Sequence, residues 1–295
     1  MRQRASRRQC RASATLLRTR SLILFLLGTG LSGCEVGSNS RLNCVVLLDY
    51  SRSLPLKTAG RFVGVIDSII LPQLDELDRL IVLPIDEAAK REPVQIVRID
   101  MSLRQFSSSR DGFAHARDSV HKRLSMFLHD TSAGVAAELW HQRDARTAFA
   151  NQTDLLSAFE QASQLLERKD SESLPRALYR FVLGKGKVDS ENWIVVLSDM
   201  IQETSEVNFA GADGISHERA VKLIDGLERS KKIADLAGAT VFVSGRTGST
   251  NRQVDAIEAF WREYFRHAGA TLAAYDYDTG QDIGARLSRR VPHAR

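Results

Sequence analysis

Cysteine is scarce in this sequence, with three residues among 295. Cys10 and Cys34 lie in or directly after an N-terminal segment that we expect to be absent from the folded domain, which leaves Cys44. Cys44 lies inside the apolar run NCVVLLD, where a thiol most often packs as a small hydrophobic side chain. A disulfide-rich fold is therefore excluded, and the domain must be stabilised by a hydrophobic core.

Acidic residues are missing from the first 20 positions, which contain seven arginines. The apolar stretch SLILFLLGTG follows, and it is too short to span a bilayer comfortably as a helix. A basic region, a short apolar core and small residues after it indicate a secretory signal. The whole chain has 41 basic and 36 acidic residues. Without the seven arginines of the signal, 34 basic and 36 acidic residues remain. Bulk charge therefore gives no support to nucleic-acid binding, and we expect no nucleic-acid partner.

Residues 31–34, LSGC, resemble the lipobox of bacterial lipoproteins. This resemblance implies a signal peptide over 1–33, a lipid on Cys34, and a lipidated tether over 34–41 that holds the protein to a membrane. The residue after the lipid cysteine is Glu35 and not the aspartate associated with inner-membrane retention, which favours the outer membrane, facing the periplasm. A simple signal peptide or signal anchor with an incidental cysteine is the alternative.

Motifs of nucleophilic and zinc enzymes are also missing. No Gly-x-Ser-x-Gly elbow occurs, and the seven histidines show no His-x-x-Glu-His or similar zinc spacing. The segment GRTGST (245–250) lacks the spacing and the lysine of a nucleotide-binding P-loop, so it reads as a strand-to-helix connection. We therefore expect a protein that is not an enzyme.

Apolar runs alternate with helical periodicity along the rest of the chain. Valine- and leucine-rich runs predict buried strands, and apolar residues at three- and four-residue spacing predict helices between them. One hairpin-like pair of strands, over 78–100, interrupts the alternation. The pattern predicts an α/β fold with a doubly wound, mostly parallel central sheet, helices on both faces and one antiparallel edge strand. The expected strands are 43–49, 78–86, 94–100, 192–199, 239–245 and 271–278, and the expected helices are 58–77, 153–167, 216–236 and 251–267.

We place the domain at residues 42–285, followed by a basic tail at 286–295. Within the domain, segment 101–152 begins polar and serine-rich and then becomes helical. It could form one or two surface helices or a partner-binding insertion.

Polar side chains with oxygen ligands follow two of the expected strands. The first strand ends in Asp49-x-Ser51-x-Ser53, Asp199 ends the run WIVVLSD, and Thr153 precedes a helix. Ligands of open α/β sheets bind at the carboxyl ends of the strands, where the strand order reverses. Few carboxylates together with hydroxyls and water suit a small divalent cation, so the sequence predicts a metal site here.

This arrangement resembles the metal-ion-dependent adhesion site of von Willebrand factor A domains and integrin I domains, over residues 42 to about 280. The resemblance implies the strand order 3-2-1-4-5-6 and Mg²⁺, or Mn²⁺ or Ca²⁺, as the bound ion. Ser51, Ser53 and Thr153 would be direct or near-direct ligands, and Asp49 and Asp199 would act directly or through water. One coordination position would stay open for an acidic side chain of a protein partner. The sequence departs from the family at Met200, where a glycine is usual, and no glycine pair precedes Thr153.

The expected function is therefore a cell-envelope lipoprotein whose domain binds a protein partner through a divalent metal. The alternative is a metal-free structural or assembly subunit, in which Asp49 caps the first helix and the two serines bond to backbone amides. A magnesium-dependent hydrolase is the weaker third reading, because hydroxyl ligands predominate and the sequence offers no obvious general base.

Overall fold

The computed structural model describes residues 41–51, 54–75, 78–86, 95–101, 113–147, 152–166, 190–209, 216–246, 248 and 250–290. All of them belong to one compact unit, Gly37–Arg295. The predicted signal peptide, the lipid site at Cys34, the metal ligand Ser53 and residues 291–295 lie outside the described residues.

Six strands form one sheet in the order β3-β2-β1-β4-β5-β6. β1 runs parallel to β2 and to β4, whereas β3 is antiparallel to β2 and forms one edge. This confirms the predicted fold class, a mostly parallel, doubly wound sheet with one antiparallel edge strand. The strands are β1 (Arg41–Asp49), β2 (Arg79–Ile85), β3 (Val97–Asp100), β4 (Ser190–Leu197), β5 (Ala239–Ser244) and β6 (Thr271–Asp276).

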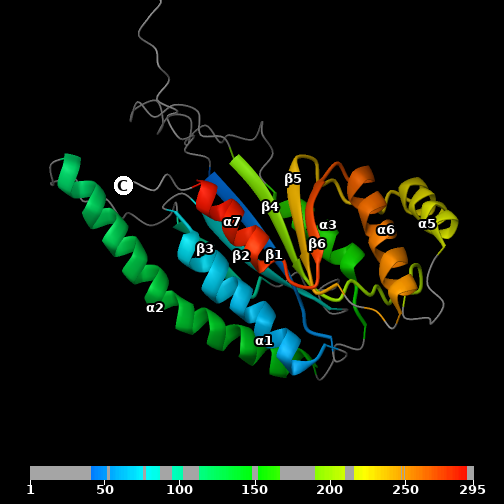
Figure 1. The fold of residues 1–295 in the computed structure, drawn as a ribbon, viewed down its shortest axis with the longest axis horizontal. Coiled ribbons are helices and arrows are strands. Elements are labelled where there is room, and N and C mark those ends of the chain that lie inside the picture. Colours follow the sequence, from blue (N-terminus) through cyan, green and yellow to red (C-terminus); the bar gives the residue numbers. More distant parts are fainter. Residues whose placement is uncertain are drawn as a thin grey trace, which may run out of the picture. The chain divides into compact units, whose positions relative to one another are not determined.

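Helices cover both faces of the sheet (Figure 1). Every residue of β1 is buried, because alternate side chains enter two separate cores: Cys44, Val46 and Leu48 face one, and Val45 and Leu47 face the other. The first core is covered by α1 (Leu56–Gly64), the π-helix η1 (Val65–Ile70), the 3-10 helix η2 (Leu71–Gln73), α2 (Phe113–Thr147) and α7 (Gly280–Arg290). The second is covered by α3 (Leu155–Leu165), α5 (His217–Arg229) and α6 (Asn251–His267).

The helix expected over 58–77 has three parts. An α-helix, α1, passes into the π-helical η1 and then into η2, which carries Pro72 in its first turn. Proline is tolerated in a first helical turn but not in a helix interior, so the chain changes its hydrogen-bonding pattern before it. The apolar spacing was read correctly, but the pattern alone did not reveal the change of helix type.

In segment 101–152 the structure describes residues 101, 113–147 and 152, and residues 113–147 form a helix of 35 residues, α2. Leu124, Leu128, Val135 and Leu139 lie buried along it, at spacings of one and two turns, and they join the core on the α1 side of the sheet. An ion pair between Arg146 and Asp86 ties the end of this helix to the end of β2. The described part of this segment is thus a helix packed on the sheet, and a partner-binding role for the segment stays a prediction.

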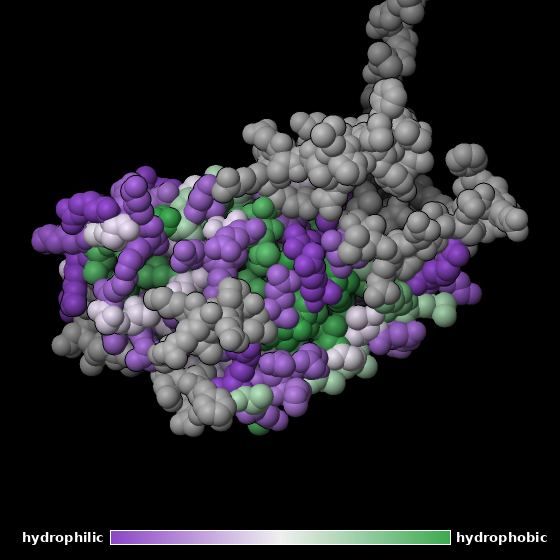
Figure 2. Space-filling view, turned by 180° about the vertical axis from the view of Figure 1, so that it is seen from behind, coloured by the Kyte–Doolittle hydropathy of each residue, from purple (hydrophilic) through white to green (hydrophobic). Residues whose placement is uncertain are grey.

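The C-terminal helix α7 continues to Arg290, past the boundary expected at residue 285. Ile283 and Leu287 are buried, and the Arg290 guanidinium lies 3.2 Å from an Asp78 carboxylate oxygen. The first residues of the supposed basic tail are therefore part of the folded domain. Figure 2 shows polar residues over most of the coloured surface on the face that it draws, with hydrophobic residues visible between them. Within the described ranges, no helix is both long and apolar enough to cross a bilayer.

Candidate metal site at the carboxyl end of the sheet

Asp49 is the last residue of β1, and its carboxylate is held from two sides. Oδ1 accepts a hydrogen bond from the Ser51 backbone N–H at 2.7 Å, and Oδ2 accepts one from Ser198 Oγ at 2.8 Å. Asp49 is 2% exposed. Burial raises the pKa of the Asp49 carboxyl above its usual value, while the hydrogen bonds from Ser51 and Ser198 oppose the rise. The carboxylate is therefore oriented by fixed donors but poorly solvated.

Asp199 follows β4, the parallel neighbour of β1, so the two aspartates lie at adjacent strand ends. One oxygen, Oδ1, accepts from the Ile201 N–H at 2.9 Å. Burial and the negative charge of Asp49 together raise the pKa of Asp199 to about 7. In the part of the chain that the structure describes, no basic side chain forms an ion pair with either aspartate. Two neighbouring buried carboxylates without a counter-charge are costly when both are ionised, and a bound cation would remove that cost.

Thr153 lies just before α3 and is 1% exposed. Its backbone carbonyl accepts a hydrogen bond from the Glu203 N–H at 3.0 Å, which joins it to the loop that follows Asp199. Its hydroxyl forms no hydrogen bond with any residue that the structure describes. The described part of the fold therefore does not use this hydroxyl, which agrees with its predicted role as an oxygen ligand.

The loop after Asp199 begins with Met200 in the left-handed region, at φ 65°. Glycine adopts this conformation at no steric cost, whereas a methionine adopts it only where its surroundings hold it there. In this chain Met200 is retained because its side chain is fully buried in the core and its backbone is fixed. Its N–H donates to Ser198 Oγ at 3.1 Å, and its carbonyl accepts from Trp261 Nε1 at 3.0 Å.

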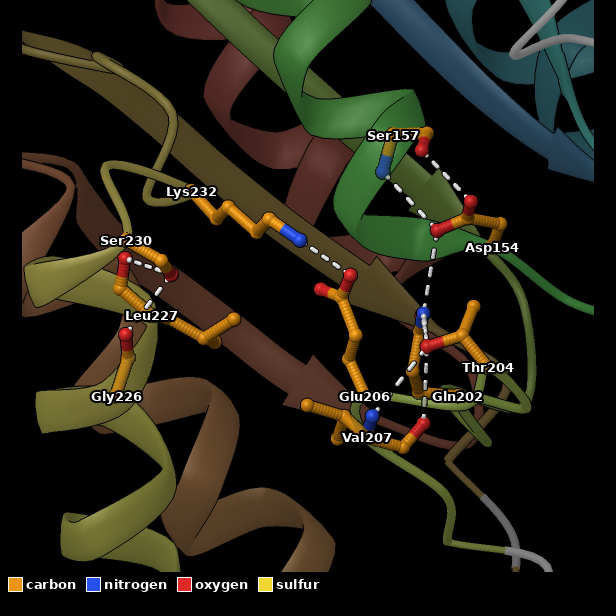
Figure 3. A network of polar contacts seen from close by, with 10 residues as sticks. All are labelled: Asp154, Ser157, Gln202, Thr204, Glu206, Val207, Gly226, Leu227, Ser230 and Lys232. Carbon is orange, nitrogen blue, oxygen red and sulfur yellow. Dashed lines mark hydrogen bonds and ion pairs between the residues drawn. The ribbon is translucent and has the colours of Figure 1, made fainter.

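Further contacts bind this loop to the start of α3 (Figure 3). The fully buried Gln202 accepts from the Leu155 N–H at 2.7 Å and donates to Asp154 Oδ1 at 3.2 Å. Asp154 in turn caps α3, accepting from the backbone N–H and the hydroxyl of Ser157. On the other side, Glu206 pairs with Lys232 beyond the end of α5. The loop is thus fixed by side chains of its own and of two neighbouring elements.

Gly245 marks the closest approach of β5 to the site. It has φ 124°, and a Cβ at this position would lie 2.3 Å from the Ser198 carbonyl oxygen. Glycine is therefore required for packing beside Ser198. This packing explains the first glycine of GRTGST, and no bound phosphate is needed to explain it. At the other end of the segment, Thr250 caps α6 through a bond from the Gln253 N–H at 3.1 Å.

The structure brings Asp49, Ser51 and Asp199 together at the carboxyl ends of β1 and β4. The hydrogen bond between Thr153 and Glu203 joins the fourth predicted ligand to the loop that follows Asp199. Within the described ranges, no three His, Cys, Asp or Glu side chains form a group that could hold a metal. The predicted ligand set has only two carboxylates, and the five-residue site stays a prediction.

Sequence reasoning missed the groups that position the predicted ligands, chiefly Ser198, Gln202 and Glu203. Ser198 could have been noticed from its place between an apolar strand and Asp199. Its bond to Asp49, however, depends on β1 and β4 being neighbours, which the local sequence does not show.

Comparisons with known proteins add little beyond the geometry. No protein-family model matches the chain, and no curated protein matches it. One solved structure that matches is an aerotolerance-related membrane protein from Bacteroides fragilis, with multiple mutations to serines. The match covers 84% of this chain and 98% of that one, at 13% sequence identity and a TM-score of 0.34. A likeness at this level does not define the fold, which follows from the strand order described above.

Proposed function

We propose that the domain is a divalent-metal-dependent binding module. In this proposal Asp49, Ser51, Ser53, Thr153 and Asp199 hold Mg²⁺, or Mn²⁺ or Ca²⁺, and the cation binds an acidic side chain of a protein partner. The observation that carries the proposal is a pair of neighbouring buried carboxylates without a basic partner among the described residues. The buried residue Thr153, whose hydroxyl forms no hydrogen bond with the described residues, supports it.

The donor set fits a small, hard cation. Carboxylate and hydroxyl oxygens are the ligands that Mg²⁺ prefers, and such ions retain several waters, one of which a partner can displace. The residues of this chain would do the positioning: Ser198 and the Ser51 N–H orient Asp49, and the Ile201 N–H orients Asp199. We propose binding and not catalysis, because three hydroxyls and only two carboxylates make up the predicted ligand set, and both carboxylates are assigned to the ion.

We also propose that the protein is attached to a membrane of the cell envelope through Cys34, facing the periplasm and at the outer membrane. The chain enters β1 at its amino end, and the site lies at the other end of this nine-residue strand, roughly 30 Å away. A tether at the amino end would therefore leave the site accessible to partners.

A metal-free structural or assembly subunit is the second candidate. It is favoured by the loop of residues 199–209, whose own hydrogen bonds hold it in place without a cation. This candidate predicts that divalent ions leave the stability of the protein unchanged.

Thr153→Val tests the proposal, because valine keeps the shape of threonine and removes only the hydroxyl. We expect the melting temperature without metal to stay close to that of the wild type, since the hydroxyl makes no hydrogen bond among the described residues. The rise in melting temperature on adding Mg²⁺ should shrink, because bound metal stabilises only the folded state. An equal rise in both proteins would exclude Thr153 as a ligand, and no rise in the wild type would favour the metal-free subunit.

A further inference from the structure

A groove of about 720 Å³ lies between the edge strand β3 and the long helix α2. Residues 96–100 line one side of it, and Phe127, Thr131, Gly134 and Glu138 line the other. None of the predicted metal ligands that the structure describes lines this groove. It is therefore separate from the site at the carboxyl ends of β1 and β4.

The outer edge of β3 presents hydrogen-bonding groups of the main chain. Among the described strands, β3 pairs only with β2. The Met101 N–H, directly after β3, donates to the Asp78 carbonyl at 2.9 Å, and successive N–H groups of a strand point to opposite sides. The N–H and the carbonyl of Arg98 therefore face away from β2. A segment laid along this edge can pair with both groups, as happens when a peptide adds to a sheet as a strand.

The two sides of the groove have similar lengths. From Phe127 to Glu138 the helix rises roughly 16 Å, and residues 96–100 span roughly 14 Å. The four lining residues of α2 are three or four positions apart, so they form one stripe along the helix, beside the stripe that is buried against the sheet. The groove therefore accommodates about five residues of extended chain.

Gly134 keeps the helix side of the groove open. It is exposed in the interior of α2, where glycine weakens a helix. A Cβ at this position would meet no atom within 4 Å, so the packing of the chain does not require glycine here, in contrast to Gly245. A residue without a side chain allows a second main chain to approach closely, which is what an extended segment in the groove would need.

The charges along the groove favour a basic group in the segment that occupies it. Asp100 already has a counter-charge, because its carboxylate lies 3.7 Å from the Arg41 guanidinium. The half-buried Glu138 accepts a hydrogen bond from Gln142 Nε2 at 2.8 Å, and within the described ranges it forms no ion pair. A lysine or arginine of the segment would complement this carboxylate. Phe127, packed against the edge of the core, offers an apolar contact beside it.

We infer that the groove binds an extended segment of a protein partner, which adds to β3 as a further strand. The segment places a lysine or arginine opposite Glu138 and apolar side chains against Phe127. This inference goes beyond the proposed metal-dependent function and does not rest on it, because no predicted ligand takes part. Binding in the groove is therefore expected to persist in EDTA.

Selection of phage-displayed random peptides on the full-length chain, in detergent and EDTA, tests the inference. Enriched peptides should alternate apolar residues with polar ones and carry a basic residue, and synthetic copies of them can be titrated. Gly134→Leu should lower their affinity at least about tenfold, because the new side chain fills the groove. Glu138→Gln should lower it several-fold. Gly226→Leu is the matched control and should bind as the wild type does, since a Cβ at this glycine of α5 also meets no atom within 4 Å.

Both leucine variants should melt no lower than the wild type, because leucine forms helices better than glycine. In the wild type, bound peptide should slow hydrogen exchange at the Arg98 N–H, and this measurement does not depend on how any variant folds. The inference is overturned if no peptide is enriched, if Gly134→Leu binds as the wild type does, or if exchange at Arg98 is unchanged. A wild-type dimer that Gly134→Leu dissociates would make a second copy of the chain the occupant, which also overturns it. None of these results bears on metal binding, which is tested separately with Mg²⁺.

Discussion

At the scale of single residues, the site depends on side chains that hold other side chains in place. Ser198 is fully buried, donates to Asp49 Oδ2 and accepts from the Met200 N–H. It therefore links the end of β1 to the left-handed turn that begins the following loop. Without it, Asp49 would lose one of the two donors that orient its carboxylate.

Ser198→Ala should lower the free energy of unfolding by about 1–3 kcal/mol, because the Met200 N–H and Asp49 Oδ2 both lose a buried partner. Urea denaturation measures the change. Ser163→Ala is the control. Among the described residues the Ser163 hydroxyl bonds only to the Glu160 carbonyl in its own helix, so its cost should stay within about 0.5 kcal/mol. Equal costs for the two variants would contradict the role assigned to Ser198.

At the scale of elements, α7 covers one face of the sheet, and its last turn reaches the end of the sheet opposite to the site. Asp78 is 1% exposed and accepts from the Leu42 N–H at 2.6 Å and the Asp75 N–H at 2.9 Å, besides its pair with Arg290. Burial raises the pKa of Asp78, and the Arg290 guanidinium opposes the rise. The last turn of α7 thus supplies the counter-charge for a buried carboxylate at the starts of β1 and β2.

A chain that ends after Ala285 should be less stable by at least about 3 kcal/mol, because it leaves Asp78 buried and unpaired and also removes the buried Leu287. A chain that ends after Arg290 keeps both residues and should unfold at the same urea concentration as one that ends at Arg295. If the two truncated chains were equally stable, α7 would not have the role described here.

At the scale of the whole molecule, stability and pH are linked through the site. The folded-state pKa of Asp199 is raised to about 7, from an ordinary value near 3.8. In metal-free protein, the proton that Asp199 binds more tightly in the folded state stabilises that state. This stabilisation is fully present below about pH 4 and is lost as the pH rises through about 7. The loss is roughly 4 kcal/mol at most.

Urea denaturation in the presence of a chelator, from pH 5 to pH 8, should accordingly show falling stability. Asp199→Asn cannot ionise, so its stability should fall less over the same range. If the free energy of unfolding of the wild type changed with pH in parallel with that of Asp199→Asn, the raised pKa of Asp199 would be contradicted.

Much of the fold could be predicted from the sequence, because strands and helices are each marked by the spacing of apolar residues along a continuous segment. The continuous apolar runs of the strands and the spacing of the helices gave six strands in the right places, and Cys44 is fully buried as expected. The predicted end of the domain, residue 285, was placed too early. The arginines Arg286, Arg289 and Arg290 made the segment look like a basic tail, although Ile283 and Leu287 give it an apolar face.

The candidate site was only partly predictable. Asp49 and Asp199 are marked by their places at strand ends, whereas the contacts of Ser198, Gln202 and Glu203 depend on which loops become neighbours after folding. Ser53 lies outside the described residues, and its predicted part in the site stays a prediction.

The most direct measurement is calorimetric titration of Mg²⁺, and then Mn²⁺, into residues 35–295, which contain the whole compact unit. Asp49→Asn is the control, because it keeps the shape of the side chain and relieves the burial of a charge. We expect saturable binding by the wild type, and binding that is abolished or greatly weakened in the variant. No binding by either protein, or equal binding by both, would contradict the metal site at the end of β1.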